Sequence, residues 1–284
     1  MIYWRLSGFY LFYFASLGAL VPFWSLYLKS LDFSMTQIGQ LIAILMATKI
    51  VAPNIWGWIA DHTGRRMSIV RAGCLLAALA FAGVFFGQGY WWLVLVMSVF
   101  SFFWNAALPQ FEATTLNHLG DQTHRYSSIR LWGSIGFIVA VAGLGALFEQ
   151  AGTALLPGVL LVLLAAIWLS SLLVPESAAG HQALNEEPLR KVLRQPAVVS
   201  LLLVCFLLQA SHGPYYTFYS LYMVDHGYSE TAIGQLWALG VVAEIAVFLK
   251  MHHWLPRFGA RNLMLAAAAL TSLVLIPWIW PFTL

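Results

Sequence analysis

Three ionisable side chains stand well inside long apolar stretches of the sequence, Lys49, Glu112 and Glu244, and Arg130 opens a fourth stretch. A charge within a bilayer costs roughly 2.5–3.5 kcal/mol on insertion scales, so such residues usually serve a function. Glu112 and Arg130 would meet if their two stretches formed an antiparallel helix pair. An arginine there can bind a carboxylate through its planar fork, and a neighbouring acid can hold or release a proton. This pair therefore predicts anion binding linked to protonation.

Lys49 and Glu244 are related by an internal repeat with an offset of 195 positions. The same offset joins several matching segments, Phe23-Trp-Ser-Leu-Tyr27 with Phe218-Tyr-Ser-Leu-Tyr222 and Ile38-Gly-Gln-Leu41 with Ile233-Gly-Gln-Leu236. A pseudo-two-fold axis would place Lys49 and Glu244 on opposite walls of a shared site, one basic and one acidic. The alternatives are a static ion pair or side chains that snorkel from helix ends. His212 is a further titratable candidate, although a structural histidine is the commoner case.

The elements that must position these residues are membrane-spanning helices. The chain of 284 residues is 61% hydrophobic and 9% charged, with a mean hydropathy of +0.80, whereas a soluble domain carries about a quarter charged residues. A spanning helix needs about 20 apolar residues. Nine segments are predicted to span: 6–28, 38–60, 68–87, 91–116, 131–148, 155–174, 198–224, 231–250 and 263–281.

A polar stretch from Pro175 to Pro196 separates the sixth predicted span from the repeat and is predicted to be a linker. We expect an N-terminal six-helix bundle over 1–174, a cytoplasmic linker over 175–197 and an incomplete C-terminal bundle over 198–284. Lysine and arginine lie almost entirely in alternate loops, and Lys29 alone occupies an outer one. By the positive-inside rule, the N-terminus and the linker are cytoplasmic, the two halves are parallel, and the C-terminus is outside. We expect a multi-pass inner-membrane protein.

Several classes of function are disfavoured by the sequence. The basic residues lie in short loops rather than on one polar face, so no nucleic-acid partner is expected. Cys74 and Cys205 each stand in an apolar run, and no histidine spacing is typical of a helical metal site. A phosphate-binding glycine loop is absent, which argues against direct ATP coupling. We expect no cofactor, no metal, no enzymatic activity and a monomer whose partners are lipid, a small molecule and protons.

The loop after the second predicted span reads Gly57-x-x-x-Asp61-x-x-Gly64-Arg65-Arg66. Its glycines permit a tight turn, and its acid can pair with the adjacent arginines. An ordinary positive-inside loop would explain the arginines but not the spaced glycines and acid. The pattern resembles the signature loop of the major facilitator superfamily. The resemblance implies that these residues act in a conformational switch.

Further segments resemble the phenylpropionate permease family, a proton-symporter branch of that superfamily: Arg130-Leu-Trp-Gly-Ser, Leu208-Gln-Ala-Ser-His-Gly-Pro-Tyr-Tyr216 and Leu239-Gly-Val-Val-Ala-Glu244. This resemblance implies a twelve-helix fold, proton-coupled uptake and an aromatic-acid class of substrate. Glu112 and Arg130 also resemble the substrate-binding pair of the more distant lactose permease. That permease places much of its proton coupling in helices nine and ten, and this sequence stops before the tenth. A set of aromatic residues in spans one and seven could stack on a substrate or pack between helices: Tyr10, Tyr13, Phe14, Tyr215, Tyr216 and Tyr219.

These observations predict an all-α membrane protein with the major facilitator fold and about nine of its twelve spans. The predicted function is secondary active transport, namely proton-coupled uptake of a small organic acid by alternating access. Two alternatives remain open at this point, an efflux transporter of amphipathic compounds and a non-transporting truncated homologue.

Overall fold

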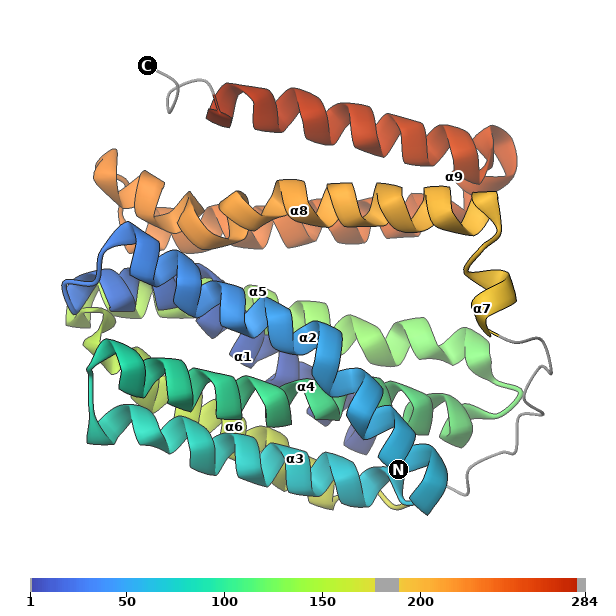
Figure 1. Cartoon of the computed structure of the whole chain (residues 1–284), viewed down its shortest axis with the longest axis horizontal. Coiled ribbons are helices and arrows are strands. Elements are labelled where there is room, and N and C mark those ends of the chain that lie inside the picture. The colour runs from blue at the N-terminus through green and yellow to red at the C-terminus, as the bar shows by residue number, and fades with distance from the viewer. Residues whose placement is uncertain (1, 177–188, 280–284) are drawn as a thin grey trace. The chain divides into compact units, whose positions relative to one another are not determined.

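The structure is a computed structural model that describes residues 2–176 and 189–279, and all regular secondary structure within these ranges is helical (Figure 1). Its α-helices are α1 Ile2–Ser30, α2 Met35–Thr63, α3 Arg66–Phe81, α4 Tyr90–Leu119, α5 Tyr126–Ala151, α6 Leu156–Leu172, α7 Leu189–Val192, α8 Pro196–Asp225 and α9 Glu230–Ile279. Short 3-10 turns join some of them, η1 Ala82–Phe86, η2 Thr123–Arg125 and η3 Thr153–Leu155. Eight helical segments of the described chain are long and apolar enough to span a bilayer.

The predicted spans coincide with these helices, with one correction. α5 begins at Tyr126, so Arg130 lies a full turn inside the helix rather than at its opening. Ser127 and Ser128 lower the hydropathy of that first turn, which is why an apolar window misses it. The predicted spans 231–250 and 263–281 both lie within α9, which consists of two helices joined across a kink at Gly259. Residues 280 and 281 of the ninth predicted span lie outside the described chain.

The internal repeat is also seen in the structure, where matching serines stand at the starts of α2 and α9. Ser34 caps α2, since its hydroxyl accepts a hydrogen bond from the Gln37 amide, and Ser229 accepts one from the Ala232 amide at the start of α9. The two serines are 195 positions apart, which is the offset of the internal repeat. Serine at this place satisfies an amide that the helix leaves unpaired. The repeated residues therefore form equivalent local structures.

Two glycines at the same offset both take a positive φ. Gly64 has φ 66° at the end of α2, and Gly259 has φ 74° inside α9. Residues with a side chain are strained at such angles, so glycine is the favoured type at both places.

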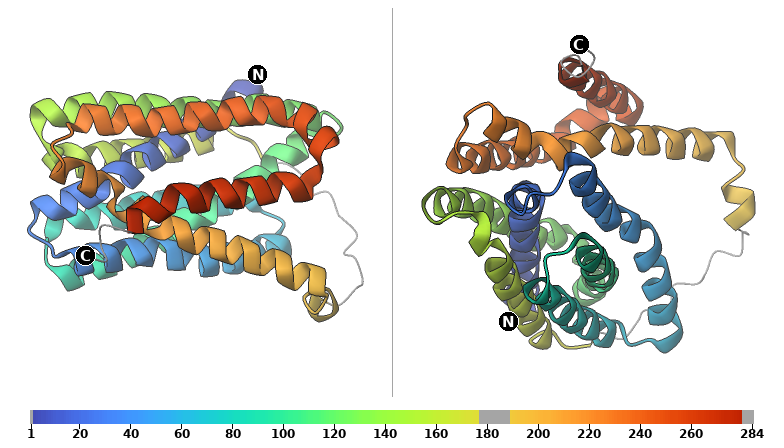
Figure 2. Two further views of the ribbon diagram at one scale, coloured as in Figure 1. Left: turned by 90° about the horizontal axis from the view of Figure 1, so that it is seen from above. Right: turned by 60° about the vertical axis from the view of Figure 1, so that its left-hand side comes forward.

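Helices α1–α6 form one bundle, in which most of α1 is buried. α1 packs on α5 and α6, α3 packs on α4 and α6, and α2 packs on α4 (Figure 2). Small residues allow α1 and α5 to approach closely, as is common between membrane helices. A Cβ at Gly136 would overlap the Leu11 carbonyl, and one at Gly18 would lie 2.8 Å from the Phe137 carbonyl oxygen. This close approach places side chains of α1 directly against the inner face of α5.

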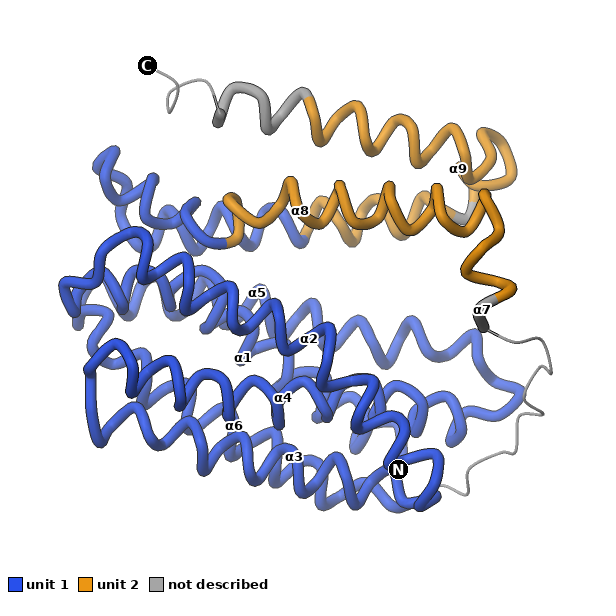
Figure 3. The backbone as a smooth tube through the Cα atoms, viewed as in Figure 1, with its two compact units in different colours: residues 1–181, 217–241 blue, residues 182–216, 242–284 orange. Residues whose placement is uncertain are grey.

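The chain forms two compact units (Figure 3). The first comprises residues 1–181 and 217–241, and the second comprises residues 182–216 and 242–284. Within the first unit, Glu149 near the end of α5 accepts a hydrogen bond of 3.3 Å from the Thr231 amide of α9. Gly145 and Gly234 bring the two helices together beside this contact. The domain boundaries predicted from the sequence, with bundles over 1–174 and 198–284 and a linker over 175–197, remain a proposal.

Candidate functional site

Glu112 on α4 and Arg130 on α5 lie side by side in the first unit. Their closest atoms, Glu112 Oε1 and Arg130 Nε, are 3.9 Å apart, which is an ion pair but too long for a hydrogen bond. The Arg130 side chain is 31% exposed and that of Glu112 is 38% exposed. In the described part of the chain, the Arg130 guanidinium donates no hydrogen bond. The guanidinium therefore keeps donors available although it lies within a candidate span.

Aromatic rings of α1 support Arg130 from one side. The guanidinium carbon lies 3.7 Å from the centre of the Phe14 ring and 5.7 Å from that of Tyr10. A cation over an aromatic face within about 6 Å is attracted by the negative potential of that face. Two members of the aromatic set predicted from the sequence thus contact the predicted anion-binding residue.

A chain of hydroxyl groups surrounds the acid. Tyr126 donates a hydrogen bond of 3.3 Å to Glu112 Oε1, the same oxygen that faces Arg130. Tyr10 is fully buried and donates to the Thr115 hydroxyl at 3.2 Å. Glu112 thus has one phenol and one guanidinium at a single oxygen.

Tyr126 and Thr115 were not identified from the sequence, although helical spacing could have found them. Tyr126 precedes Arg130 by four positions, and Thr115 follows Glu112 by three, so each shares a helix face with a predicted site residue. The missing information was the true start of α5, because the predicted span began after Tyr126.

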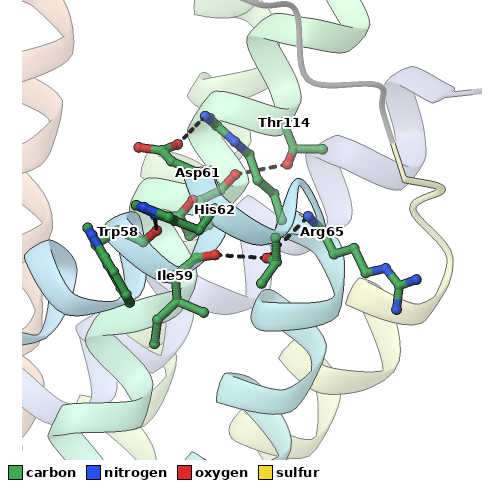
Figure 4. A network of polar contacts seen from close by, with 9 residues as sticks. Trp58, Ile59, Asp61, His62, Arg65 and Thr114 are labelled. Atoms are coloured by element: carbon green, nitrogen blue, oxygen red, sulfur yellow. Dashed lines mark hydrogen bonds and ion pairs between the residues drawn. The ribbon is translucent and has the colours of Figure 1, made fainter.

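The signature loop forms a second polar centre, at the junction of α2 and α3. Arg66 donates a hydrogen bond of 2.8 Å to Asp61, which is the pairing expected from the sequence. Gly64 ends α2, and its amide bonds to the Ala60 carbonyl. The side chains of His62 and Thr63 bond back to carbonyls of Trp58 and Ile59 on α2 (Figure 4).

The remaining residues of the loop have less specific surroundings. Arg65 is exposed and precedes α3 without a side-chain capping bond. Gly57 faces Gln110 of α4, where an added Cβ would make an ordinary contact at 3.6 Å. The loop is also tied to the chain after α6, since the Glu176 carboxylate accepts a hydrogen bond of 3.0 Å from the Met67 amide. This contact between distant segments had no signal in the sequence.

The other predicted residues are not gathered at Arg130. Lys49 is exposed on α2, next to Thr48, whose hydroxyl accepts a hydrogen bond from Asn105. Glu244 is exposed on α9 in the second unit, so its pairing with Lys49 remains a prediction. His212 is half-buried on α8, where Nδ1 lies 2.7 Å from the Leu208 carbonyl oxygen. That contact is typical of a structural histidine. No group of metal-ligating side chains occurs in the searched ranges of the structure.

Comparison with known proteins gives consistent results. A family model described as the MFS_1 like family matches residues 3–280. The "Probable 3-phenylpropionic acid transporter" of Escherichia coli (strain K12) is 30% identical over 91% of this chain and 69% of its own length. The "Maltose permease" of Geobacillus stearothermophilus is 29% identical over 93% of this chain and 68% of its own.

Solved structures agree on the fold. A crystal structure of the nucleoside transporter NupG matches with a TM-score of 0.75 at 17% sequence identity, over 92% of this chain and 69% of that one. A mutant of the same transporter matches with a TM-score of 0.79 over 92% of this chain and 70% of that one. At this identity, the likeness establishes the fold and does not extend to the substrate.

Proposed function

The chain belongs to the MFS_1 like family, and from this premise we propose that it takes up a small organic acid together with protons. Membership makes the chain a multi-pass membrane protein of a family of secondary transporters rather than enzymes. The finer proposal concerns three properties: the chemical class of the substrate, the coupling to protons and the direction of transport.

The observation that carries the proposal is the state of Arg130. Its charge stands within a candidate span, is supported by Phe14, and contacts Glu112 at 3.9 Å without a hydrogen bond. An arginine with unused planar donors suits a carboxylate, which accepts two parallel hydrogen bonds. A substrate carboxylate would then accept the hydrogen bonds that Arg130 does not donate to Glu112.

Glu112 supplies the link to protons. When the substrate is absent, its charge compensates Arg130, because an isolated charge inside a span is strongly disfavoured. When a substrate carboxylate binds Arg130, two carboxylates would crowd one guanidinium, which favours protonation of Glu112. Tyr126 bonds to the same carboxyl oxygen and can adjust its hydroxyl to either protonation state. Binding of the acid and uptake of a proton are coupled by this repulsion.

The name of one relative supports an aromatic acid as the substrate. That relative is described as a probable 3-phenylpropionic acid transporter. The compound 3-phenylpropionic acid combines a carboxylate with a phenyl ring. Arg130 fits the carboxylate, and the rings of Tyr10 and Phe14 lie beside it. We propose inner-membrane residence with the N-terminus in the cytoplasm, on the basis of the arginine distribution.

The test is uptake of radiolabelled 3-phenylpropionate into cells or proteoliposomes with an imposed pH gradient. We expect accumulation when the outside is acidic and its loss when a protonophore is added. Arg130→Lys keeps the charge but loses the planar fork, so we expect uptake to fall about 100-fold. Arg125→Lys is the matched control, since Arg125 is exposed and its side chain bonds only to Gln122 in the described chain. Equal uptake by wild type and Arg130→Lys, at matched protein levels, would contradict the proposal.

The same assay separates the two alternatives. An efflux transporter would lower the cell content of preloaded substrate and would show no accumulation under an inward proton gradient. A non-transporting homologue would give no flux in either direction. Reporter fusions test the orientation independently, with a cytoplasmic signal expected at Arg65 and an external signal expected at Asp225.

A further inference from the structure

Arg130 contacts α1 in a geometry that requires a precise fit between two helices. Its guanidinium carbon lies 3.7 Å above the Phe14 ring, which is about the distance of two surfaces in van der Waals contact. A hypothetical Cβ at Gly133 would lie 2.7 Å from Arg130 Nη1 and 2.7 Å from Phe14 Cδ2. The absence of a side chain at position 133 therefore leaves the space in which ring and guanidinium meet.

We infer that Phe14 is a positioning residue, which fixes the plane of the Arg130 guanidinium through a cation–π contact that Gly133 makes possible. The inference rests on the proposed function, because it assigns Phe14 a role in presenting Arg130 to a substrate carboxylate. An aromatic ring attracts the face of the guanidinium and leaves the edge, with its N–H donors, uncovered. A carboxylate binds at that edge.

The ring also explains how the pair with Glu112 stays open. A guanidinium with no other support would close on the carboxylate to form a hydrogen bond, as Arg66 does with Asp61 at 2.8 Å. Attraction to the face of Phe14 competes with that closure, so the distance to Glu112 remains 3.9 Å. The donors are thereby kept for a ligand rather than used up internally.

Contacts between α1 and α5 on either side of Phe14 hold it in register with Arg130. Tyr3 accepts a hydrogen bond of 3.0 Å from the Trp132 indole and donates to the Ser128 carbonyl at 3.3 Å. These bonds tie the first turns of α1 and α5 together. Gly136 against Leu11 continues the same contact further along the helices. A ring on α1 can therefore position a guanidinium on α5 without a direct covalent constraint.

The test replaces Phe14 with phenylalanine analogues that carry one, two or three ring fluorines, incorporated at that position alone. Fluorine weakens the negative potential of the ring face while it changes the size of the ring little. Two quantities are measured on the full chain in nanodiscs: the thermal unfolding midpoint and the affinity for 3-phenylpropionate. The series is made in two backgrounds, with Arg130 and with Arg130→Gln.

We expect a progressive fall of the midpoint with each fluorine when Arg130 is present and no trend with Arg130→Gln. Affinity should fall in the same order, by about 2- to 30-fold over the series, the range that corresponds to a cation–π contact. Phe14→Leu should lose affinity like the trifluorinated ring, while Phe14→Trp should retain it. Gly133→Ala should weaken binding by separating ring and guanidinium, whereas Gly143→Ala, which has open space around it, is the control.

The remaining outcomes are also decisive. A flat midpoint series in both backgrounds would overturn the inference, because no cation–π coupling would exist. A clear midpoint trend with unchanged affinity would make Phe14 a structural support and would overturn its positioning role. A clear midpoint trend in a protein that does not bind 3-phenylpropionate would contradict the proposed function, while the coupling would still support Phe14 as the residue that orients Arg130.

Discussion

The first unit contains two acid–arginine pairs, and they differ in how completely they are satisfied. Asp61 and Arg66 at the α2–α3 junction form a hydrogen bond of 2.8 Å, whereas Glu112 and Arg130 stay 3.9 Å apart. The first pair is five residues apart in sequence and is closed. The second joins two helices, rests on an aromatic ring and is open. The hydrogen-bonded pair is suited to a contact that forms in one conformation and breaks in another. The pair without a hydrogen bond is suited to a site where a ligand replaces Glu112 as the partner of Arg130.

The largest effect should come from exchanging the charges of the open pair, Glu112→Arg with Arg130→Glu. A carboxylate at position 130 would face the negative potential of the Phe14 ring, and no arginine fork would stand on α5. We expect a loss of transport of about 100-fold or more, measured as initial uptake of labelled substrate. Wild-type transport by the exchange variant would show that only the opposite charges of this pair matter, and not which helix carries the arginine.

A smaller effect is expected from Asp61→Asn in the closed pair. The Asp61 side chain is 66% exposed, so its ion pair with Arg66 contributes about 0.2–1 kcal/mol, and its loss should shift the balance between conformations and lower the transport rate by up to about 5-fold. The substrate concentration for half-maximal uptake should change little, because Asp61 lies at the α2–α3 junction and not beside Arg130. Initial-rate kinetics separate the two quantities. A large loss of affinity with normal turnover would place Asp61 in the substrate site.

Glu112→Gln should change pH dependence more than binding. Glutamine keeps the shape and can still accept a bond from Tyr126, but it cannot take up a proton. We expect the affinity of the Glu112→Gln variant for substrate to stay within a few-fold of the wild-type value. We expect this affinity to be independent of pH over the range in which the wild-type affinity changes with pH. Binding isotherms at several pH values provide the measurement. An unchanged pH profile would remove Glu112 from the coupling mechanism.

The smallest effect should follow from exchanging the loop pair, Asp61→Arg with Arg66→Asp. Asp61 lies in the last turn of α2 and Arg66 opens α3, so both charges oppose the dipole of their own helix. The exchange should therefore raise stability, by about 0.3–1 kcal/mol for each charge. The thermal unfolding midpoint measures this change. A destabilised exchange variant would indicate that the native orientation of the pair is needed for folding itself.

Much of this molecule could be predicted from its sequence, because long apolar segments and the repeat are strong signals. The spans, the Asp61–Arg66 pairing and the proximity of Glu112 to Arg130 followed from length, charge and helix direction. Helix ends were less predictable, since polar first turns such as that of α5 escape an apolar window. The contacts of Phe14 and Glu176 depend on how separate helices pack, and a single sequence carries no such distance information. Roles of Lys49, Glu244 and His212 remain predictions.

Two of the glycines of positive φ, Gly64 and Gly259, bear on how the two halves of the chain are related. They stand at matching places of the two halves, whereas Asp61 of the first half corresponds to Pro256 of the second. A left-handed backbone angle restricts both copies of a repeated segment to residues that tolerate it, and Asp32 (φ 62°) and Gly227 (φ 81°), also 195 positions apart, meet the same requirement with different residues. The two halves thus share backbone turns at matching places, while the side chains at positions 61 and 256 differ in charge and in hydrogen-bonding capacity.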